Sequence, residues 1–208
     1  MDVGPQNPII LDMKSVKLVI GIGNPDGQYQ NTRHNVGFML VDYIAKKCDF
    51  SSKGGPASGW EFNKKLNALT AKCKLEGSPV ILAKPQTYVN KTGEAAAKLK
   101  NFYKVKPEQI LVIQDDLDIP FGNTKISFEK NSGGHRGIES IMKSLKTKKF
   151  YRLRIGLATR NLQKARQQSD KKRDNFVVKM VLSKFSPSEQ DGIKKIFKEG
   201  YEKVLQLN

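Results

Sequence analysis

Short apolar runs rich in β-branched residues alternate along this chain with segments whose apolar residues recur at helical spacing. The short runs predict buried strands, and the periodic segments predict helices. The predicted strands are Val16–Ile22, Leu66–Leu75, Pro79–Ala83, Ile110–Gln114, Lys125–Phe128, Arg152–Ala158 and Phe176–Leu182. The predicted helices are Asn35–Cys48, Gly93–Tyr103, Gly137–Lys146 and a last one that begins at the capping box Ser186-Pro187-Ser188-Glu189. This alternation predicts an α/β fold, in which a sheet has helices on both faces.

The length of 208 residues fits a single domain. We expect residues 1–15 to form an N-terminal extension and residues 16–208 to form the domain. Within the domain, Arg160–Asn175 is rich in charge and has no apolar period. This segment is predicted to be a mobile basic loop that can touch nucleic acid.

The formal net charge of +17 is the first indication of a partner. From Lys143 onward lie 18 of the 37 basic residues but only 6 of the 20 acidic residues. Such an excess is costly through self-repulsion and favours a polyanionic partner, above all a nucleic acid. An anionic membrane is a weaker alternative because no segment forms a strongly amphipathic basic helix, and a basic surface kept for solubility is the third. No apolar stretch approaches the ~18 residues of a membrane span, and the N-terminus lacks a secretory pattern.

The two cysteines, Cys48 and Cys73, are too few for a disulfide framework and do not form a CxxC pair. We expect both to be reduced, buried thiols in a cytosol-like compartment. Together with the absence of a secretory pattern, this predicts a cytoplasmic protein.

Polar side chains follow several of the predicted strands at the point where each strand ends. Asn24 follows the first strand, Asn90 comes shortly after the third, and Asp115 directly follows the fourth. Ligands of open α/β sheets collect beyond the carboxyl ends of the strands, so these side chains are expected at one edge of the sheet. His34 lies close to the same edge, between the first turn and the first helix.

Imidazole is suited to proton transfer near neutral pH, so the two histidines, His34 and His135, are the candidates for a general base. The alternative for His34 is a helix-capping or core histidine, and for His135 it is a structural turn residue. Asp115 is the best-placed carboxylate to orient a base. Asp116 and Asp118 leave a metal site as a weaker alternative, since no paired histidines accompany them. No serine or cysteine lies in a G-x-S-x-G pattern, which favours water as the nucleophile.

Five sequence blocks follow one another in an order that is specific. The first is Gly23-Asn24-Pro25 followed by Tyr29-x-x-Thr32-Arg33-His34-Asn35-Val36-Gly37. The others are Lys84-Pro85-x-Thr87-Tyr88-Val89-Asn90-x-x-Gly93, Asp115-Asp116-Leu117-Asp118-Ile119-Pro120-x-Gly122, Ser132-Gly133-Gly134-His135-x-Gly137 and Arg152-Leu153-Arg154-Ile155-Gly156. In these blocks, which span roughly Lys17 to Leu207, the chain resembles the bacterial-type peptidyl-tRNA hydrolase family.

The resemblance implies a monomer with a twisted mixed sheet, no metal and no organic cofactor. It also implies hydrolysis of the ester that joins a peptide to the 3′ ribose of tRNA. His34 matches the general base, Asp115 the carboxylate that orients it, and Asn24 an amide that helps to discriminate blocked from free aminoacyl-tRNA. The implied contacts to substrate and tRNA are Tyr29, Asn35, Tyr88, Asn90 and Arg154, with Lys125 as a companion of Arg154. Bacterial-type members also serve organelles, so a mitochondrial location is the alternative to the cytoplasm.

The chain departs from the family pattern at three places. Arg136 stands where the family often has Asn, so a phosphate contact of the guanidinium is the alternative to the substrate contact of that amide. Gln114 stands where many members have His, which removes a possible second imidazole near Asp115. The Arg160–Asn175 segment is longer than the usual turn.

Two rival functions stay open. Some proteins of this fold are RNA-splicing helpers that bind RNA without catalysis, and a generic esterase would need no RNA. The joint presence of Asn24, His34, Asn90 and Asp115 favours hydrolysis over pure binding, and the charge of +17 disfavours a generic esterase.

Overall fold

In the part of the chain that the computed structural model describes, residues 16–48, 59–159, 162 and 169–208, seven strands form one sheet. The predicted extension, residues 1–15, lies outside these residues. The strands are β1 (Leu18–Gly21), β2 (Glu61–Asn63), β3 (Ala68–Leu75), β4 (Ser78–Pro85), β5 (Ile110–Pro120), β6 (Thr124–Phe128) and β7 (Tyr151–Ala158). The α-helices are α1 (Val36–Lys47), α2 (Thr92–Phe102), α3 (Arg136–Leu145), α5 (Asp170–Val181) and α6 (Gln190–Gln206). Short 3₁₀ helices are η1 (Gly27–Tyr29), η2 (Arg33–Asn35), η3 (Val89–Lys91), η4 (Pro107–Gln109) and η5 (Pro187–Glu189).

The sheet is mixed, and its strand order is β2-β3-β4-β1-β5-β7-β6. The four central strands, β4, β1, β5 and β7, are parallel. The pairs β2–β3, β3–β4 and β6–β7 are antiparallel. The carboxyl ends of the four central strands therefore meet at one edge of the sheet.

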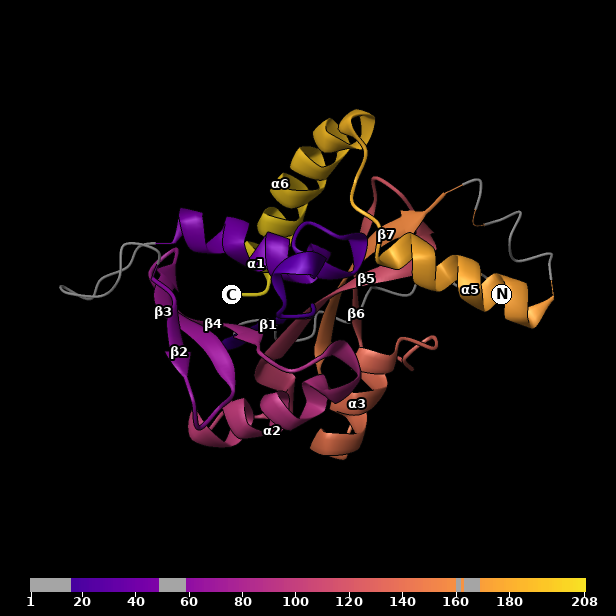
Figure 1. The fold of residues 1–208 in the computed structure, drawn as a ribbon. Coiled ribbons are helices and arrows are strands. Elements are labelled where there is room, and N and C mark those ends of the chain that lie inside the picture. The colour runs from indigo at the N-terminus through magenta and orange to yellow at the C-terminus, as the bar shows by residue number, and fades with distance from the viewer. Residues whose placement is uncertain (1–15, 49–58, 160–161, 163–168) are drawn as a thin grey trace, which may run out of the picture.

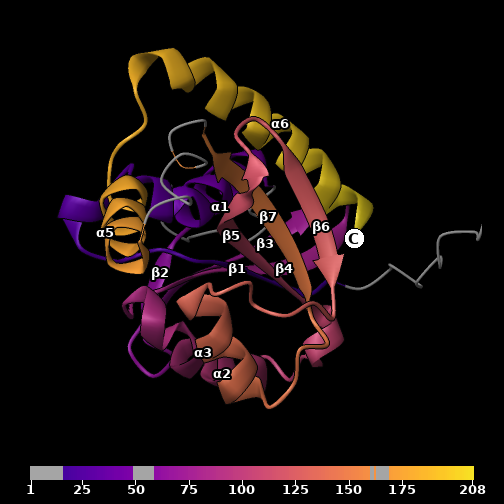
Figure 2. The ribbon, with the colours of Figure 1, turned by 90° about the vertical axis from the view of Figure 1, so that its right-hand side faces the viewer.

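Two layers of helices cover the sheet. Successive residues of a strand point to opposite faces, so a strand whose residues are all apolar must be covered on both faces. On β1, Val19 packs in a buried cluster with α1 and α6, whereas Leu18 and Ile20 pack in a second cluster with α2 and α3. Figure 1 shows α1 and α6 on one side of the sheet and α2 and α3 on the other. In Figure 2, α5 lies to the left of the sheet, with α6 above and with α2 and α3 below. The predicted α/β fold with helices on both faces of a mixed sheet is confirmed. None of the helices in these described residues is both long and apolar enough to cross a membrane.

One predicted element is wrong in type. Phe176–Leu182 was expected to be a strand, but it lies in and just after helix α5. The same helix includes residues 170–175, the end of the predicted loop Arg160–Asn175, while residues 160, 161 and 163–168 lie outside the described ones. β5 also runs past Gln114 as far as Pro120, so Asp115 lies within the strand rather than after it.

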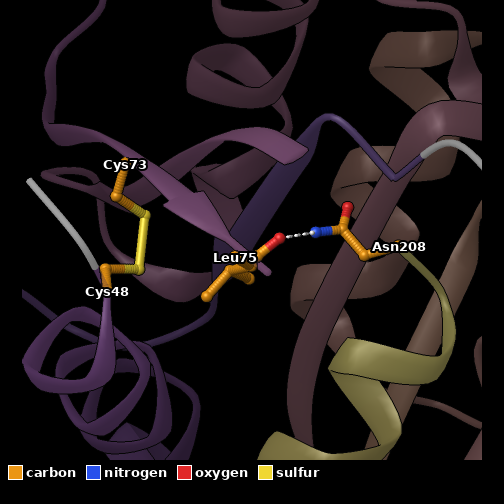
Figure 3. The surroundings of a disulfide bond; sticks show 4 residues. All are labelled: Cys48, Cys73, Leu75 and Asn208. Carbon is orange, nitrogen blue, oxygen red and sulfur yellow. Dashed lines mark hydrogen bonds between the residues drawn. A yellow bond between two sulfur atoms is a disulfide. The ribbon is translucent and has the colours of Figure 1, made fainter. Parts of the chain in front are cut away.

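The expectation of two reduced thiols is also wrong. Cys48, at the end of α1, and Cys73, on β3, form a disulfide, with Cα atoms 5.7 Å apart (Figure 3). Beside it, Asn208 Nδ2 donates a hydrogen bond to the carbonyl oxygen of Leu75, which joins the C-terminus to the same strand. The cysteine-based argument for a cytosol-like compartment therefore no longer stands.

Candidate active site

A cleft of about 850 Å³ opens at the carboxyl ends of β1 and β5. Its walls come from the turn after β1, from η3, from the second half of β5, from the start of α3 and from α5. Seven of the ten residues that the sequence predicted as site residues line it, namely Asn24, Tyr29, His34, Tyr88, Asn90, Asp115 and Arg136. The four residues that were expected together at one edge of the sheet, Asn24, His34, Asn90 and Asp115, are among these seven.

His34 reaches this edge because α1 packs very closely onto the strands. A Cβ atom on Gly37, in the first turn of α1, would lie 2.5 Å from the carbonyl oxygen of Ile113 and 2.6 Å from the amide nitrogen of Ile22. Any side chain at this position would push the helix away from β1 and β5. The glycine therefore brings the start of α1, and with it the preceding η2 that contains His34, against the ends of these strands.

His34 and Asp115 form a hydrogen-bonded pair in the cleft. His34 Nδ1 lies 2.9 Å from Asp115 Oδ1. An ionised carboxylate can only accept, so Nδ1 carries the proton of the neutral ring and Nε2 keeps its lone pair. Burial disfavours the charged ring, but the charge of Asp115 and this hydrogen bond outweigh it and raise the pKa of His34 above its usual value. The pair has the arrangement of a general base with its orienting carboxylate.

A second imidazole contacts the same carboxylate oxygen, which the sequence did not predict. His135 Nε2 lies 3.1 Å from Asp115 Oδ1, and the rings of His34 and His135 have their centroids 5.5 Å apart. The substitution at Gln114 was expected to leave Asp115 without a second imidazole, and that expectation is wrong because His135 supplies it from the start of α3. Burial alone would raise the pKa of Asp115, but the two imidazoles and their hydrogen bonds hold it well below its usual range.

These three side chains also resemble a metal site, since their ligand atoms lie within 4.8 Å of one another. His135 does not suit that role. Its Nδ1 accepts hydrogen bonds from the amides of Gly137 and Ile138, at 3.1 and 3.4 Å, and its Nε2 donates to Asp115. A neutral ring with its acceptor nitrogen in use has no lone pair for a metal ion. The contacts of His135 therefore favour a hydrogen-bonded cluster over a metal centre.

Asp116 and Asp118 on β5, which suggested a metal site, make contacts within the protein. Asp116 Oδ2 accepts a hydrogen bond of 2.7 Å from Arg154 Nε, and its Oδ1 accepts one from the backbone amide of Asp118. Arg154, predicted as a phosphate contact, is thus only 7% exposed. Lys125 is exposed on β6 and lies opposite Arg154 in the strand register. Neither residue lines the cleft.

Asn24 and Asn35 fix the turn that follows β1. The Asn35 side chain accepts from the backbone amide of Asn24 and donates to its carbonyl oxygen, each at 2.9 Å. Asn35 is therefore buried as a support of the turn and does not line the cleft. The Asn24 side-chain oxygen accepts from the backbone amide of Val89 at 3.0 Å. This contact identifies which end of the Asn24 amide is the oxygen. The –NH₂ group is therefore the end that can donate a hydrogen bond to a ligand in the cleft.

The remaining predicted residues form the rim of the cleft. Tyr88 is 50% exposed, and its hydroxyl donates to Asp26 Oδ2 at 2.6 Å, which raises the pKa of Tyr88. Asn90, on η3, and Arg136, at the first position of α3, are exposed, and Tyr29 is half-buried. Exposed aromatic, amide and guanidinium groups can contact bases and phosphates of a nucleic acid.

The sequence missed the wall that α5 contributes. Its apolar cleft residues are Val177, Val178 and Val181, followed by Leu182. Arg33, next to His34, anchors the segment that follows this helix: its guanidinium donates to Ser183 Oγ and to the carbonyl oxygen of Lys184, and it binds both carboxylate oxygens of Glu189. An arginine inside a sequence motif is the signal that could have indicated such an anchor.

Comparisons with known proteins agree with this geometry. The model of the family described as peptidyl-tRNA hydrolase matches residues 18–207. The peptidyl-tRNA hydrolase of Aquifex aeolicus is 44% identical over 184 residues, which cover 88% of this chain and 85% of that protein. That of a Sulfurihydrogenibium species is 38% identical and covers 92% of this chain and 96% of its own length. The crystal structure of the Acinetobacter baumannii peptidyl-tRNA hydrolase superposes with a TM-score of 0.75 at 29% identity, over 92% of this chain and 88% of that one. The chain belongs to the peptidyl-tRNA hydrolase family.

Proposed function

We propose that this protein hydrolyses the ester bond between peptide and tRNA in peptidyl-tRNA, and so recycles the tRNA, with His34 as general base on water. The hydrogen bond of 2.9 Å between His34 Nδ1 and Asp115 Oδ1 carries the proposal. It leaves the other ring nitrogen able to take a proton, at a residue that lines the cleft. Family membership of nearly the whole chain supports the same reaction.

In the proposed reaction, His34 Nε2 takes a proton from water while the water oxygen attacks the ester carbonyl carbon. The amides of Asn24 and Asn90 donate to the oxygen that becomes negatively charged. The bond from carbon to the ribose oxygen then breaks, and His34 returns the proton to that oxygen. Asp115 stabilises the protonated ring between the two steps. General-base catalysis typically raises the rate ~10²–10⁴-fold, and one oxyanion donor raises it about 10²–10³-fold. Hydrolysis of an ester requires no stronger catalytic groups.

The tRNA phosphates are expected to bind outside the bottom of the cleft. Four carboxylates line the cleft, whereas its cationic lining residues are Lys91 and Arg136. Of the two other predicted phosphate contacts, the exposed Lys125 is the better candidate, because Arg154 is paired with Asp116. We propose Arg136 and Lys125 as phosphate contacts, whose loss would weaken binding and reduce its dependence on salt.

We propose further that the protein acts as a monomer and needs no metal or cofactor. Its proposed location is the cytoplasm, with mitochondria as the alternative. A non-catalytic RNA-binding function is the rival. The relatives described above have the names of hydrolases, and the cleft retains the complete set of Asn24, His34, Asn90 and Asp115. A purely binding function has no need of this set.

The decisive experiment measures release of peptide from peptidyl-tRNA and of amino acid from free aminoacyl-tRNA. We expect the protein to cleave the first much faster, and His34→Ala to lose about 10²–10⁴-fold in kcat while tRNA binding is kept. Near-parental turnover by His34→Ala would refute the mechanism. Equal cleavage of both substrates would refute the role given to Asn24.

A further inference from the structure

His135 is the histidine that the proposed reaction does not use, although its side chain is only 10% exposed and faces Asp115. It is the N-cap residue of α3. Its Nδ1 accepts from two backbone amides at the start of that helix, so the proton of the neutral ring must lie on Nε2. A proton on Nδ1 would break both capping hydrogen bonds. The helix therefore assigns the tautomer of His135 and makes Nε2 a donor to Asp115.

Two donors thus share one oxygen atom. His34 Nδ1 and His135 Nε2 lie 2.9 and 3.1 Å from Asp115 Oδ1. We propose that His135 is a positioning residue for the reaction, which holds Asp115 Oδ1 in place and withdraws part of its negative charge from His34. This keeps more of His34 in the unprotonated form that accepts a proton from water. The inference rests on the proposed role of His34 as general base.

The direction of the effect follows from the charge on the shared oxygen. Asp115 stabilises protonated His34, and a second N–H directed at the same oxygen weakens that stabilisation. Without the donor at position 135, the full charge of Oδ1 would face His34, and the pKa of His34 would rise further. Proton transfer to His34 would then fail over a wider range of pH.

Other charged or titratable groups line the same cleft as His34, and a test of His135 must leave them unchanged. From β5 they are Asp116 and Asp118, from α3 Arg136 and from α5 Asp174. From the loops around η1 and η3 they are Tyr29, Tyr88 and Lys91. Each is present in both proteins when a single variant at position 135 is compared with the parent, so none of them accounts for a difference.

The substitution His135→Asn separates the two contacts of His135. Asn is among the best N-cap residues, so the cap of α3 can persist, whereas the shorter side chain has no nitrogen at the position of Nε2. Glu139→Gln is the matched control, because Glu139 lies in the first turn of α3 and accepts from Ser132 Oγ rather than contacting Asp115. A similar melting temperature of all three proteins would show that α3 is retained.

The measurement is an NMR pH titration of His34, which needs no substrate. With two histidines in the chain, His135→Asn leaves a single imidazole signal. We expect its midpoint to lie about 0.5–1 pH unit above that of the parent, and the acidic limb of kcat/KM to move by the same amount. Glu139→Gln should leave the midpoint within a few tenths of a unit. An unchanged or lower midpoint in His135→Asn would overturn the proposal, as would uniform loss of activity with no movement of the pH profile.

A second measurement uses the parent protein and so does not depend on how any variant folds. Imidazole ¹⁵N shifts report which ring nitrogen is protonated. We expect protonated Nε2 and bare Nδ1 at His135, and the reverse at neutral His34. A protonated Nδ1 at His135 would overturn the proposal. Because neither NMR experiment measures hydrolysis, a failure here is distinguishable from a failure of the proposed enzyme activity.

Discussion

Asp115 and Asp116 are neighbours on β5 and have buried side chains, 4% and 9% exposed, yet their surroundings differ in chemistry. Asp115 binds two imidazoles, while Asp116 binds the guanidinium of Arg154. Imidazole exchanges a proton near neutral pH, and guanidinium does not. The partner rather than the carboxylate therefore decides which of two adjacent pairs can perform proton transfer and which can only hold the sheet together.

The comparison predicts that Asp115→Asn affects the rate most. An Asn side chain can present –NH₂ to His34 Nδ1 and so favour the wrong tautomer, which should lower kcat by about 10²–10⁴-fold. Loss of the charge should also lower the pKa of His34, and the midpoint of the acidic limb of kcat/KM should fall below that of the parent. Measurements of kcat and kcat/KM for peptidyl-tRNA hydrolysis over a range of pH check both effects. A variant with parental kcat at every pH would contradict the role of Asp115.

In the parent, the raised pKa of His34 fixes the sign of the pH dependence. As pH falls through that pKa, Nε2 becomes protonated and cannot accept a proton from water. We therefore expect kcat/KM to decline on the acidic side with a midpoint above about 6.5, the usual value for histidine.

Asp116→Asn should act on stability instead. Removal of one partner from a buried ion pair leaves Arg154 charged and unpaired, which costs about 3–5 kcal/mol in the free energy of unfolding. We expect kcat of the folded fraction to change much less than in Asp115→Asn. Urea unfolding together with kinetics at low temperature measures both quantities. A loss of rate as large as that of Asp115→Asn, without loss of stability, would show that the two pairs do not divide their roles in this way.

The smallest expected effect is that of a chelator. Because Asp115 and Asp116 are occupied by protein donors, excess EDTA should leave the rate of peptidyl-tRNA hydrolysis unchanged. Loss of activity that added divalent metal restores would return the His34–Asp115–His135 cluster to the candidates for a metal centre.

Much of this arrangement could be predicted from periodicity and strand ends. The apolar runs identified the central strands, and the order of strands and turns along the sequence was enough to place Asn24, His34 and Asp115 at one edge of the sheet. Helix α5 was predicted as a strand because the run Phe176–Leu182 is short, apolar and β-branched, and such a run does not distinguish a strand from the apolar face of a helix.

The remaining features depend on contacts between distant segments. The hydrogen bond of His135 to Asp115 joins residues 20 positions apart, and the disulfide joins Cys48 to Cys73 over 25. No local pattern encodes either approach. The sequence showed a histidine in a glycine-rich turn before a helix, which suggested a structural turn residue, but not that the Nε2 atom of this histidine reaches the carboxylate of Asp115 on β5.

The anchor of Arg33 has a consequence for how the enzyme matures during synthesis. Its partners, Ser183, Lys184 and Glu189, lie about 150 residues downstream. Until that part of the chain has left the ribosome, the residue beside the proposed base lacks its hydrogen-bond acceptors, and the α5 wall of the cleft is missing. The nascent chain therefore contains His34 early but completes its surroundings late, so a translation product that ends before Ser183 would contain the histidine without the acceptors of Arg33.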